Sequence, residues 1–280
     1  DQIGSRLLFR SYGGSPSVAP VHAALVAYDS LLILDEAHCS IPFSQTVSSV
    51  RKYLDPVKWS KEGISLAPRL HLMIMTATPP KNLGIDPDEL FPLPDQRDKA
   101  VDHPVLLQRR EAKKLALLEP CKGKGRSDPL LPVAVKQVEK QIASGRKRIA
   151  VMVNRVRDAQ AIHDALLPLS KRADIVLLTG RMRPIDRDEL VQQWMPFLKA
   201  NNPNDPDRPI VIVTTQCLEV GADFSFDALI TECASLDALL QRFGRLARLG
   251  EPNETHACIL ARESDIKEAE DPIYGQALAN

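Results

Sequence analysis

The sequence predicts an α/β protein with two parallel-sheet domains. Strand-sized apolar runs, such as residues 31–34 and 210–213, alternate with segments of helical apolar spacing. This alternation is typical of parallel sheets covered by helices. Polar residues directly follow several of these runs, as expected at the sheet edge where ligands bind. A length of 280 residues suits two domains of ordinary size.

The composition excludes several classes of protein. Hydrophobic residues make up 44% of the chain and charged residues 26%, and 36 Lys and Arg balance 36 Asp and Glu. This excludes a disordered polyelectrolyte and a histone-like basic protein, so nucleic-acid binding would need a local positive groove. The apolar runs are far shorter than the roughly 20 residues of a membrane span. No signal peptide is visible and the five cysteines form no C-x-x-C pair, which favours reduced thiols in the cytoplasm.

The first domain is expected at residues 1–98. Residues 1–28 have helical apolar spacing interrupted by a Gly-Gly-Ser-Pro turn, which predicts two helices. The apolar runs at 31–34 and 71–75 are expected to be buried strands. Both strands end in polar residues.

A linker is expected at residues 99–126, because this stretch is basic and has no sustained periodicity. The second domain is expected at 127–262, and 263–280 would begin a C-terminal extension. Within the second domain the pattern predicts helices at 132–144, 157–169, 186–198 and 236–247, and strands at 149–153, 175–178, 210–213, 228–231 and 257–260.

An acidic pair follows the first strand. Asp35 and Glu36 come directly after the apolar run and precede Ala37 and His38. Two carboxylates at a strand end can hold Mg²⁺ beside ATP, with Asp35 as a metal ligand and Glu36 orienting and deprotonating the attacking water. An isolated Asp-Glu pair is more often a solvated turn, so the other motifs decide its meaning.

Small hydroxyl residues follow the second strand. Thr76 and Thr78 can form hydrogen bonds between neighbouring strand ends. By themselves they are typical of an ordinary strand-to-turn boundary. Their expected position near Asp35 makes them candidates for coupling.

An arginine motif lies on the predicted helix 236–247. It reads Gln241-Arg242-Phe243-Gly244-Arg245, and Arg242 and Arg245, three residues apart, share a helix face. Two guanidiniums could meet one triphosphate, where an arginine finger contributes about 10³ to 10⁵ in rate. The alternative is a solvated basic face.

The segment 214–223 follows the strand predicted at 210–213. Gly221 would permit close approach of the backbone, Asp223 could accept hydrogen bonds from ribose hydroxyls, and Thr214 or Thr215 could donate to a phosphate. A simple turn is the alternative.

Together these segments resemble the motor of a superfamily 2 helicase. In chain order, 35–38 is similar to the DEAH-type motif II, 76–78 to motif III, 151–155 to motif IV, 214–223 to motif V and 241–245 to motif VI. The segments 1–8, 178–187 and 236–242 are similar to the CRISPR-associated helicase-nuclease of type I interference systems. The resemblance covers nearly all of residues 1–262. It implies two RecA-like domains, the first truncated at its N-terminus, with ATP and Mg²⁺ as cofactors, translocation on single-stranded DNA, and recruitment by a CRISPR RNA-guided surveillance complex.

The resemblance also implies roles in nucleotide binding. Asp35 and Glu36 would take the metal and water roles, and Asp223, with Gly221 beside it, would hold the ribose. His38 would couple the γ-phosphate to a set of polar residues, namely Thr76, Thr78 and Gln241. Arg242 and Arg245 would grip the triphosphate.

Further residues would hold DNA phosphates. In the first domain these are Gln2 and Arg6. In the second they follow successive strands and are Asn154, Arg155, Gly180, Arg181 and Thr215.

The sequence departs from the family in two respects. No G-x-x-x-x-G-K-[ST] loop is present, and the Gly-Lys-Gly at 123–125 has Leu118 where the first glycine would stand. We therefore expect the loop upstream of residue 1, and negligible ATP hydrolysis by these 280 residues alone. The pair His163-Asp164 lies inside a predicted helix without further ligands, so a nuclease domain is expected on other sequence or on another chain.

Two alternatives remain open. One is another DEAH-type motor, such as an RNA helicase or a restriction-complex translocase. The other is a non-hydrolysing scaffold of helicase shape that binds nucleic acid. The presence of Glu36, Arg242 and Arg245 favours a motor, on the expectation that these side chains serve turnover rather than folding.

Overall fold

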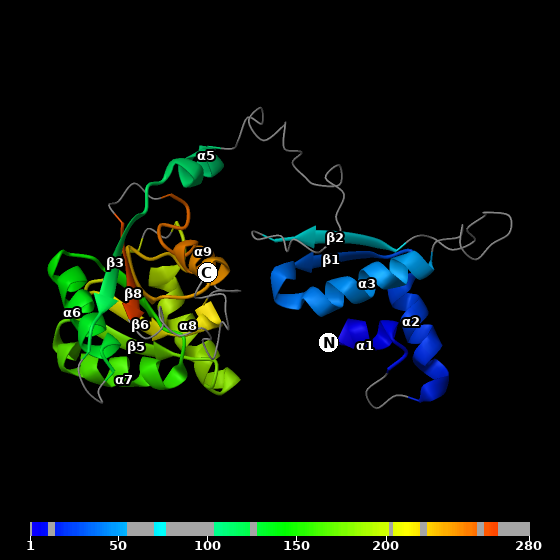
Figure 1. The fold of residues 1–280 in the computed structure, drawn as a ribbon, viewed down its shortest axis with the longest axis horizontal. Helices are drawn as coiled ribbons and strands as arrows, with labels where there is room; N and C mark the ends of the chain where they lie inside the picture. Colours follow the sequence, from blue (N-terminus) through cyan, green and yellow to red (C-terminus); the bar gives the residue numbers. More distant parts are fainter. Residues whose placement is uncertain are drawn as a thin grey trace. The chain divides into compact units, whose positions relative to one another are not determined.

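The computed structural model describes residues 2–10, 15–54, 70–76, 104–123, 128–201, 204–218, 223–250 and 255–262. The chain divides into two compact units, Asp1–Ala100 and Val101–Asn280 (Figure 1).

The first unit is a parallel strand pair with helices packed on one face. Strands β1 (Leu31–Asp35) and β2 (His71–Met75) are accompanied by α1 (Gln2–Leu7), α2 (Ala19–Ala27), α3 (Ile41–Tyr53) and the 3₁₀ turns η1 (Pro16–Val18) and η2 (Ala37–Ser40). Leu7, Val47 and Leu70 form the centre of the small core. The other face of the pair carries exposed apolar side chains, including Leu31 and Ile33, each 59% exposed.

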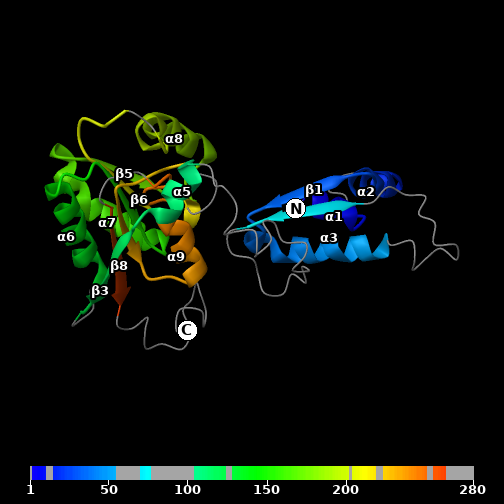
Figure 2. The same cartoon turned by 90° about the horizontal axis from the view of Figure 1, so that it is seen from above.

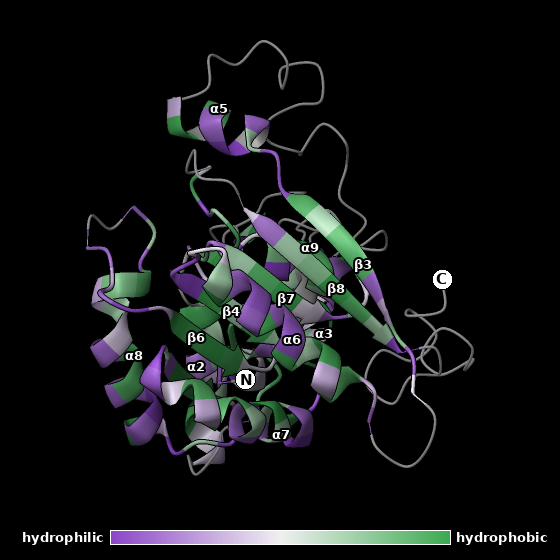
Figure 3. Ribbon diagram, turned by 90° about the vertical axis from the view of Figure 1, so that its left-hand side faces the viewer, coloured by the Kyte–Doolittle hydropathy of each residue, from purple (hydrophilic) through white to green (hydrophobic). Residues whose placement is uncertain are grey.

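The second unit, seen from above in Figure 2, has a six-stranded parallel sheet in the order β3-β8-β7-β4-β6-β5. Figure 3 labels β3, β8, β7, β4 and β6 side by side in this order. The strands are β3 (Leu115–Cys121), β4 (Arg148–Met152), β5 (Asp174–Leu178), β6 (Ile210–Thr214), β7 (Ala228–Glu232) and β8 (His256–Arg262). The helices are α5 (Pro104–Glu111), α6 (Leu130–Ala143), α7 (Val156–Leu166), α8 (Pro184–Leu198) and α9 (Leu236–Phe243), with short turns η4 (Leu167–Lys171) and η5 (Gln216–Leu218).

Both faces of this sheet are covered by helices. In the central strand β4, Ile149 and Val151 belong to the core under α6 and α7, whereas Ala150 and Met152 belong to the core that includes α8 side chains. Successive side chains of a strand point to opposite faces, so β4 is apolar on both faces from Ile149 to Met152. Figure 3 shows the hydrophobic colour of the central strands. The predicted α/β class with parallel sheets is confirmed.

The structure corrects the expected linker. Residues 99–126 include α5 and β3, and β3 pairs with β8 along its whole length. β3 is an edge strand with mostly exposed side chains. Its apolar run at 115–118 is followed by Glu119 and by Pro120, and a proline is typical of an edge strand. The sequence also failed to indicate α3.

The predicted helix 236–247 is shorter than expected. α9 ends at Phe243, and the chain then forms a parallel bridge between Leu246 and Phe226. Among the described residues, no helix is long and apolar enough to cross a membrane.

Candidate functional site

The acidic pair occupies the end of β1. The amide of Glu36 donates a hydrogen bond of 2.9 Å to Asp35 Oδ1, and Glu36 adopts a left-handed backbone with φ of 48°. A left-handed conformation is uncommon outside glycine and is concentrated at functional sites. Asp35 is exposed, and a carboxylate accepts several further ligands. This arrangement fits Mg²⁺, which is usually held by one or two carboxylates, water and phosphate.

Other predicted residues of the first unit lie partly outside the described residues. Asp35 is opposite Met75 in the strand pair, so Thr76 follows at the same edge. His38 lies in η2, whereas Thr78 is outside the described residues. Gln2 and Arg6 are exposed on α1.

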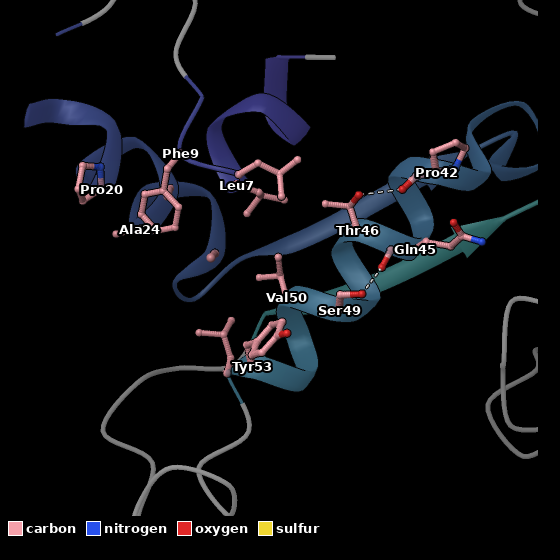
Figure 4. A pocket seen from close by; sticks show the side chains of 14 residues that line it. Leu7, Phe9, Pro20, Ala24, Pro42, Gln45, Thr46, Ser49, Val50 and Tyr53 are labelled. Atoms are coloured by element: carbon pink, nitrogen blue, oxygen red, sulfur yellow. Dashed lines mark hydrogen bonds between the residues drawn. The ribbon is translucent and has the colours of Figure 1, made fainter. Parts of the chain in front are cut away.

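A separate apolar groove lies among α1, α2 and α3 (Figure 4). It has a volume of about 980 Å³ and is lined by residues such as Leu7, Phe9, Val50 and Tyr53. None of the predicted site residues lines it. The groove is therefore not a candidate nucleotide site.

The predicted DNA-contacting residues of the second unit gather at one edge of its sheet. Asn154 and Arg155 follow β4, Thr215 follows β6, and Gly180 and Arg181 follow β5. These three strands are neighbours in the sheet and run parallel. In open parallel sheets the carboxyl edge is the usual ligand-binding edge.

Asn154 is buried and its side chain is used inside the protein. It is 7% exposed, its Nδ2 donates to the Cys233 carbonyl at 2.8 Å, and its Oδ1 accepts from Arg242 at 2.9 Å. The Gln216 side chain donates to its carbonyl. Within this unit Asn154 therefore links the ends of β4 and β7 to α9.

Arg242 is also buried within its own unit. It is 0% exposed, and its Nη1 donates to Thr231 Oγ1 at 2.9 Å and to the Glu232 carbonyl at 3.0 Å. With the bond to Asn154, the guanidinium is enclosed by acceptors of its own unit. A buried cation requires such compensation. Arg242 therefore holds α9 against β4 and β7.

A network of charged side chains extends from Glu232, at the end of β7, to Arg262, at the end of β8. Glu232 is 3% exposed and accepts from the Asn154 amide at 2.6 Å and from Arg262. Arg262 also donates to Asp128 at 2.8 Å and to Asp158 at 3.1 Å. Sequence reasoning missed this network, because these residues are far apart in the chain and match no motif.

The pKa values in the network shift in opposite directions. Burial raises the pKa of Glu232 above 4.5, and Arg262 only partly offsets this. The hydrogen bond from Arg262 lowers the pKa of Asp128 below 3.8. The pKa of Arg262 is raised despite burial, because Asp128 and Glu232 stabilise its charge.

The arginine loop, residues 244–250, follows α9. The carbonyl of Arg245 accepts from the Phe226 amide at 2.9 Å, and the Ala247 amide donates to the Phe226 carbonyl at 3.0 Å. Ala247 has a left-handed φ of 39°, which is strained for a residue with a side chain. Phe226 precedes β7, so the loop is held beside the amino end of that strand.

The loop carries a residue that sequence reasoning missed. Arg248 Nε lies 2.8 Å from Asp223 Oδ1, and both side chains are partly exposed. Arg248 continues the three-residue spacing of Arg242 and Arg245, and this was the available signal. Gly221 lies outside the described residues.

Gln241 differs from its neighbour Arg242. Its Nε2 is buried and has no hydrogen-bond partner among the residues that the structure describes. Buried polar groups are nearly always paired. The amide is therefore a donor that a ligand or another segment could satisfy.

No group of three or more potential metal ligands occurs within the described ranges. His163 Nδ1 lies 3.2 Å from Asp164 Oδ1 on α7, as a simple neighbouring pair. Burial raises the pKa of the Cys258 thiol to about 11, which makes it unreactive.

The chain is similar in sequence to proteins of one family. Residues 145–251 match the family described as CRISPR-associated nuclease/helicase Cas3, C-terminal. The CRISPR-associated helicase Cas3 of Thermoproteus tenax is 53% identical over 47 residues, covering 16% of this chain and 8% of that protein. The CRISPR-associated nuclease/helicase Cas3 of Haloferax volcanii is 33% identical over 87 residues, covering 30% of this chain and 9% of that protein. These matches span only small parts of the relatives.

Solved structures are similar over nearly the whole chain. The T. fusca Cas3-AMPPNP structure has a TM-score of 0.69 at 17% identity and covers 99% of this chain and 33% of its own. A chain of the structure described as "CRISPR RNA-guided surveillance complex, pre-nicking" has a TM-score of 0.66 at 16% identity and covers 98% of this chain and 35% of its own. At these identities the likeness shows the fold. Over residues 145–251 the chain therefore resembles the C-terminal part of Cas3, and its fold is similar to that of the Cas3 structures.

Proposed function

We propose that the chain works as a nucleotide-driven motor on single-stranded DNA in CRISPR interference. Asp35 would hold Mg²⁺ and Glu36 would deprotonate the water that attacks the γ-phosphate. Arg245 and Arg248 would meet the charge that develops on that phosphate. When bound, Mg²⁺ would neutralise charge on the phosphate oxygens.

The hydrogen bonds of the Arg242 guanidinium inside its own unit are the observation that favours this assignment of arginines; burial does not separate Arg242 from Arg245, which is 5% exposed. The donors of Arg242 are directed to Thr231, Glu232 and Asn154 inside the unit. Arg248 is 31% exposed and is held by Asp223. We infer that Asp223 orients Arg248 before nucleotide binds, and that it accepts a ribose hydroxyl when the arginine turns to the phosphate.

The strand ends of the second unit support a DNA-binding site that is separate from the arginine loop. Arg155, Gly180, Arg181 and Thr215 follow adjacent strands at the carboxyl edge, whereas the arginine loop lies beside the amino end of β7. Gly180 is exposed and an added Cβ there would meet no atom within 4 Å. A backbone with such open space can approach a phosphate closely.

Gln2 and Arg6 would form the DNA-binding site of the first unit. During the nucleotide cycle the two DNA-binding sites would hold the strand in turn. ATP binding would draw the arginines to the γ-phosphate, and hydrolysis would release them. We propose recruitment by a CRISPR RNA-guided surveillance complex, because one solved structure with a chain of the same fold is described as such a complex.

Arginine substitutions test this proposal in a protein that joins residues 1–280 to a phosphate-binding loop. Arg245→Ala and Arg248→Ala should each lower kcat for DNA-stimulated ATP hydrolysis by about 10³-fold or more. Glu36→Gln should also abolish turnover. Arg187→Ala is the matched control, because Arg187 is an exposed arginine paired only with its neighbour Asp188 in the described part of the chain. Unchanged kcat in both arginine variants would refute the assignment.

The stimulating nucleic acid tests the substrate. Single-stranded DNA should raise the rate of ATP hydrolysis more than single-stranded RNA of the same sequence. A greater response to RNA would instead indicate an RNA motor. The 280-residue chain alone should hydrolyse negligible ATP, because it has no G-x-x-x-x-G-K-[ST] loop; robust DNA-stimulated turnover would contradict this expectation.

A further inference from the structure

The arginine loop is also held by a segment that precedes the sheet. Lys114 Nζ donates a hydrogen bond of 2.8 Å to the carbonyl of Phe243, the last residue of α9. Gln108 Nε2 donates a hydrogen bond of 2.8 Å to the Gly250 carbonyl. The two bonds therefore fix the two ends of the arginine loop.

Gly250 allows α5 to lie against the loop. Its φ is 76°, and an added Cβ would lie 2.4 Å from the Gln108 carbonyl oxygen and 2.8 Å from the Arg109 nitrogen. Both atoms belong to the helix backbone and cannot turn away as a flexible side chain could. The close approach of these two backbones requires glycine.

The loop is held on another side by the segment before β7. The Arg248 amide donates to Ser225 Oγ at 3.0 Å, and the Phe226 backbone bonds to Arg245 and Ala247. The Lys114 ammonium also lies at the C-terminal end of α9, where a positive charge is favourable. Arg245, which is 5% exposed, and the partly exposed Arg248 thus belong to a backbone that two separate segments constrain.

The position of α5 in the chain suggests why this contact matters. α5 starts at Pro104, shortly after the boundary between the two units at Ala100 and Val101. The chain that connects the units is therefore continuous with the segment that holds the loop. A displacement of this connection would therefore reach the loop through the hydrogen bonds of Gln108 and Lys114.

We propose that α5 and Lys114 form a latch that positions Arg245 and Arg248 for the γ-phosphate. Lys114 and Gln108 are positioning residues, and they act through the backbone of the loop without touching nucleotide. This inference rests on the proposed function of the two arginines. It adds that the chain segment connecting the two units determines the position of Arg245 and Arg248 relative to the γ-phosphate.

Lys114 variants test the latch in the protein that hydrolyses ATP. Lys114→Met keeps the aliphatic stem and removes the ammonium. It should lower kcat by about 10-fold to 100-fold, the scale of a small misplacement of a reacting group, with KM for ATP changed by less than about twofold. Lys114→Arg should restore most of kcat, because it can also donate to the Phe243 carbonyl. Unchanged kcat in Lys114→Met, or no rescue by Lys114→Arg, would overturn the role of Lys114.

Two glycine variants separate the latch from backbone strain. Gly250→Ala and Gly145→Ala both place alanine at positive φ, 76° and 81°, but a Cβ at Gly145 would meet nothing within 4 Å. Gly250→Ala should lower kcat at least about tenfold more than Gly145→Ala. Equal effects of the two variants would overturn the close-approach argument.

Hydrogen exchange provides a readout that needs no ATPase activity. The Ala247 and Gly250 amides are bonded to the carbonyls of Phe226 and Ala247. Their exchange should be at least about tenfold faster in Lys114→Met and Gly250→Ala than in wild type, and unchanged in Gly145→Ala. If residues 1–280 joined to a phosphate-binding loop show no ATPase activity, the proposed function fails, but hydrogen exchange still tests the latch. Equal protection in all four proteins would overturn the latch.

Discussion

Arg242 and Arg248 have surroundings that their positions in the sequence do not predict. Arg242 belongs to the recognisable Gln-Arg-x-Gly-Arg sequence but is enclosed by Asn154, Thr231 and Glu232. Arg248 stands outside that sequence and is partly exposed. The interactions of Arg242 hold α9 on the sheet, so we expect this residue to serve folding as well.

Substituting these two arginines should affect stability very differently. Arg242→Met removes the donor to three buried acceptors, and the free energy of unfolding should fall by about 3 kcal/mol or more. Arg248→Met removes one partly exposed ion pair, and the loss should be no more than about 1 kcal/mol. Urea denaturation followed by circular dichroism measures both. Equal losses would contradict the structural role of Arg242.

The pKa of Glu232 predicts a pH dependence of stability. Its folded-state pKa is raised by burial, so its stabilising contribution is greatest below the unfolded pKa and is lost as pH rises through the folded pKa. The stability of wild type relative to Glu232→Gln should therefore fall as pH rises from about 4 to about 7. Unfolding free energies of the two proteins across this range measure it.

Asp128 provides an internal contrast of opposite sign. Its folded-state pKa is lowered by Arg262, so its contribution is present above the unfolded pKa and is lost as pH falls through the folded pKa. Asp128→Asn should therefore destabilise the protein at neutral pH and lose its effect in acid. A rise with pH in the stability advantage of wild type over Glu232→Gln would contradict the raised pKa.

At the scale of elements, strands of similar sequence have different surroundings. β4 is buried on both faces, and Ile149 is 0% exposed. β1 is an equally apolar run, but in the described part of the chain the side chains on one of its faces are exposed, and Ile33 is 59% exposed. The apolar composition predicted both strands, whereas the layers that pack against them decide burial.

The same substitution in both strands tests this difference. Ile149→Ala should lower the free energy of unfolding by about 2 to 5 kcal/mol, because it leaves a cavity in a closed core. Ile33→Ala should cost less than about 1 kcal/mol. Chemical denaturation of the two variants is the measurement. A similar cost at Ile33 would show that the outer face of β1 is covered.

At the scale of the whole molecule, the two units have unequal cores. In the second unit, helices cover both faces of the sheet, and a separate hydrophobic core lies on each face. The first unit has a small core on one face around Leu7, Val47 and Leu70, and apolar residues on the other. The two units should therefore differ in autonomous stability.

Residues 101–280 should fold by themselves. Expressed alone, they should unfold cooperatively with a Tm within about 5 °C of the more stable transition of the 280-residue chain, since a change of about 1 kcal/mol shifts Tm by a few degrees. Residues 1–100 alone should self-associate through their exposed apolar face. Calorimetry and analytical ultracentrifugation measure these properties. A non-cooperative transition of residues 101–280 would contradict an independent second unit.

The sequence by itself determined the α/β class, the central strands β4, β6 and β7 and the order of the motifs, because apolar runs and strand-end polar residues are local patterns. Only the tertiary structure decided that β3 joins the sheet, that Asn154 and Arg242 are buried, and that Arg262 unites Asp128, Asp158 and Glu232. These features depend on contacts between residues far apart in the chain, such as Asp128 and Arg262, which are 134 positions apart. A side chain's burial and partners are set by such packing, which a local pattern does not encode.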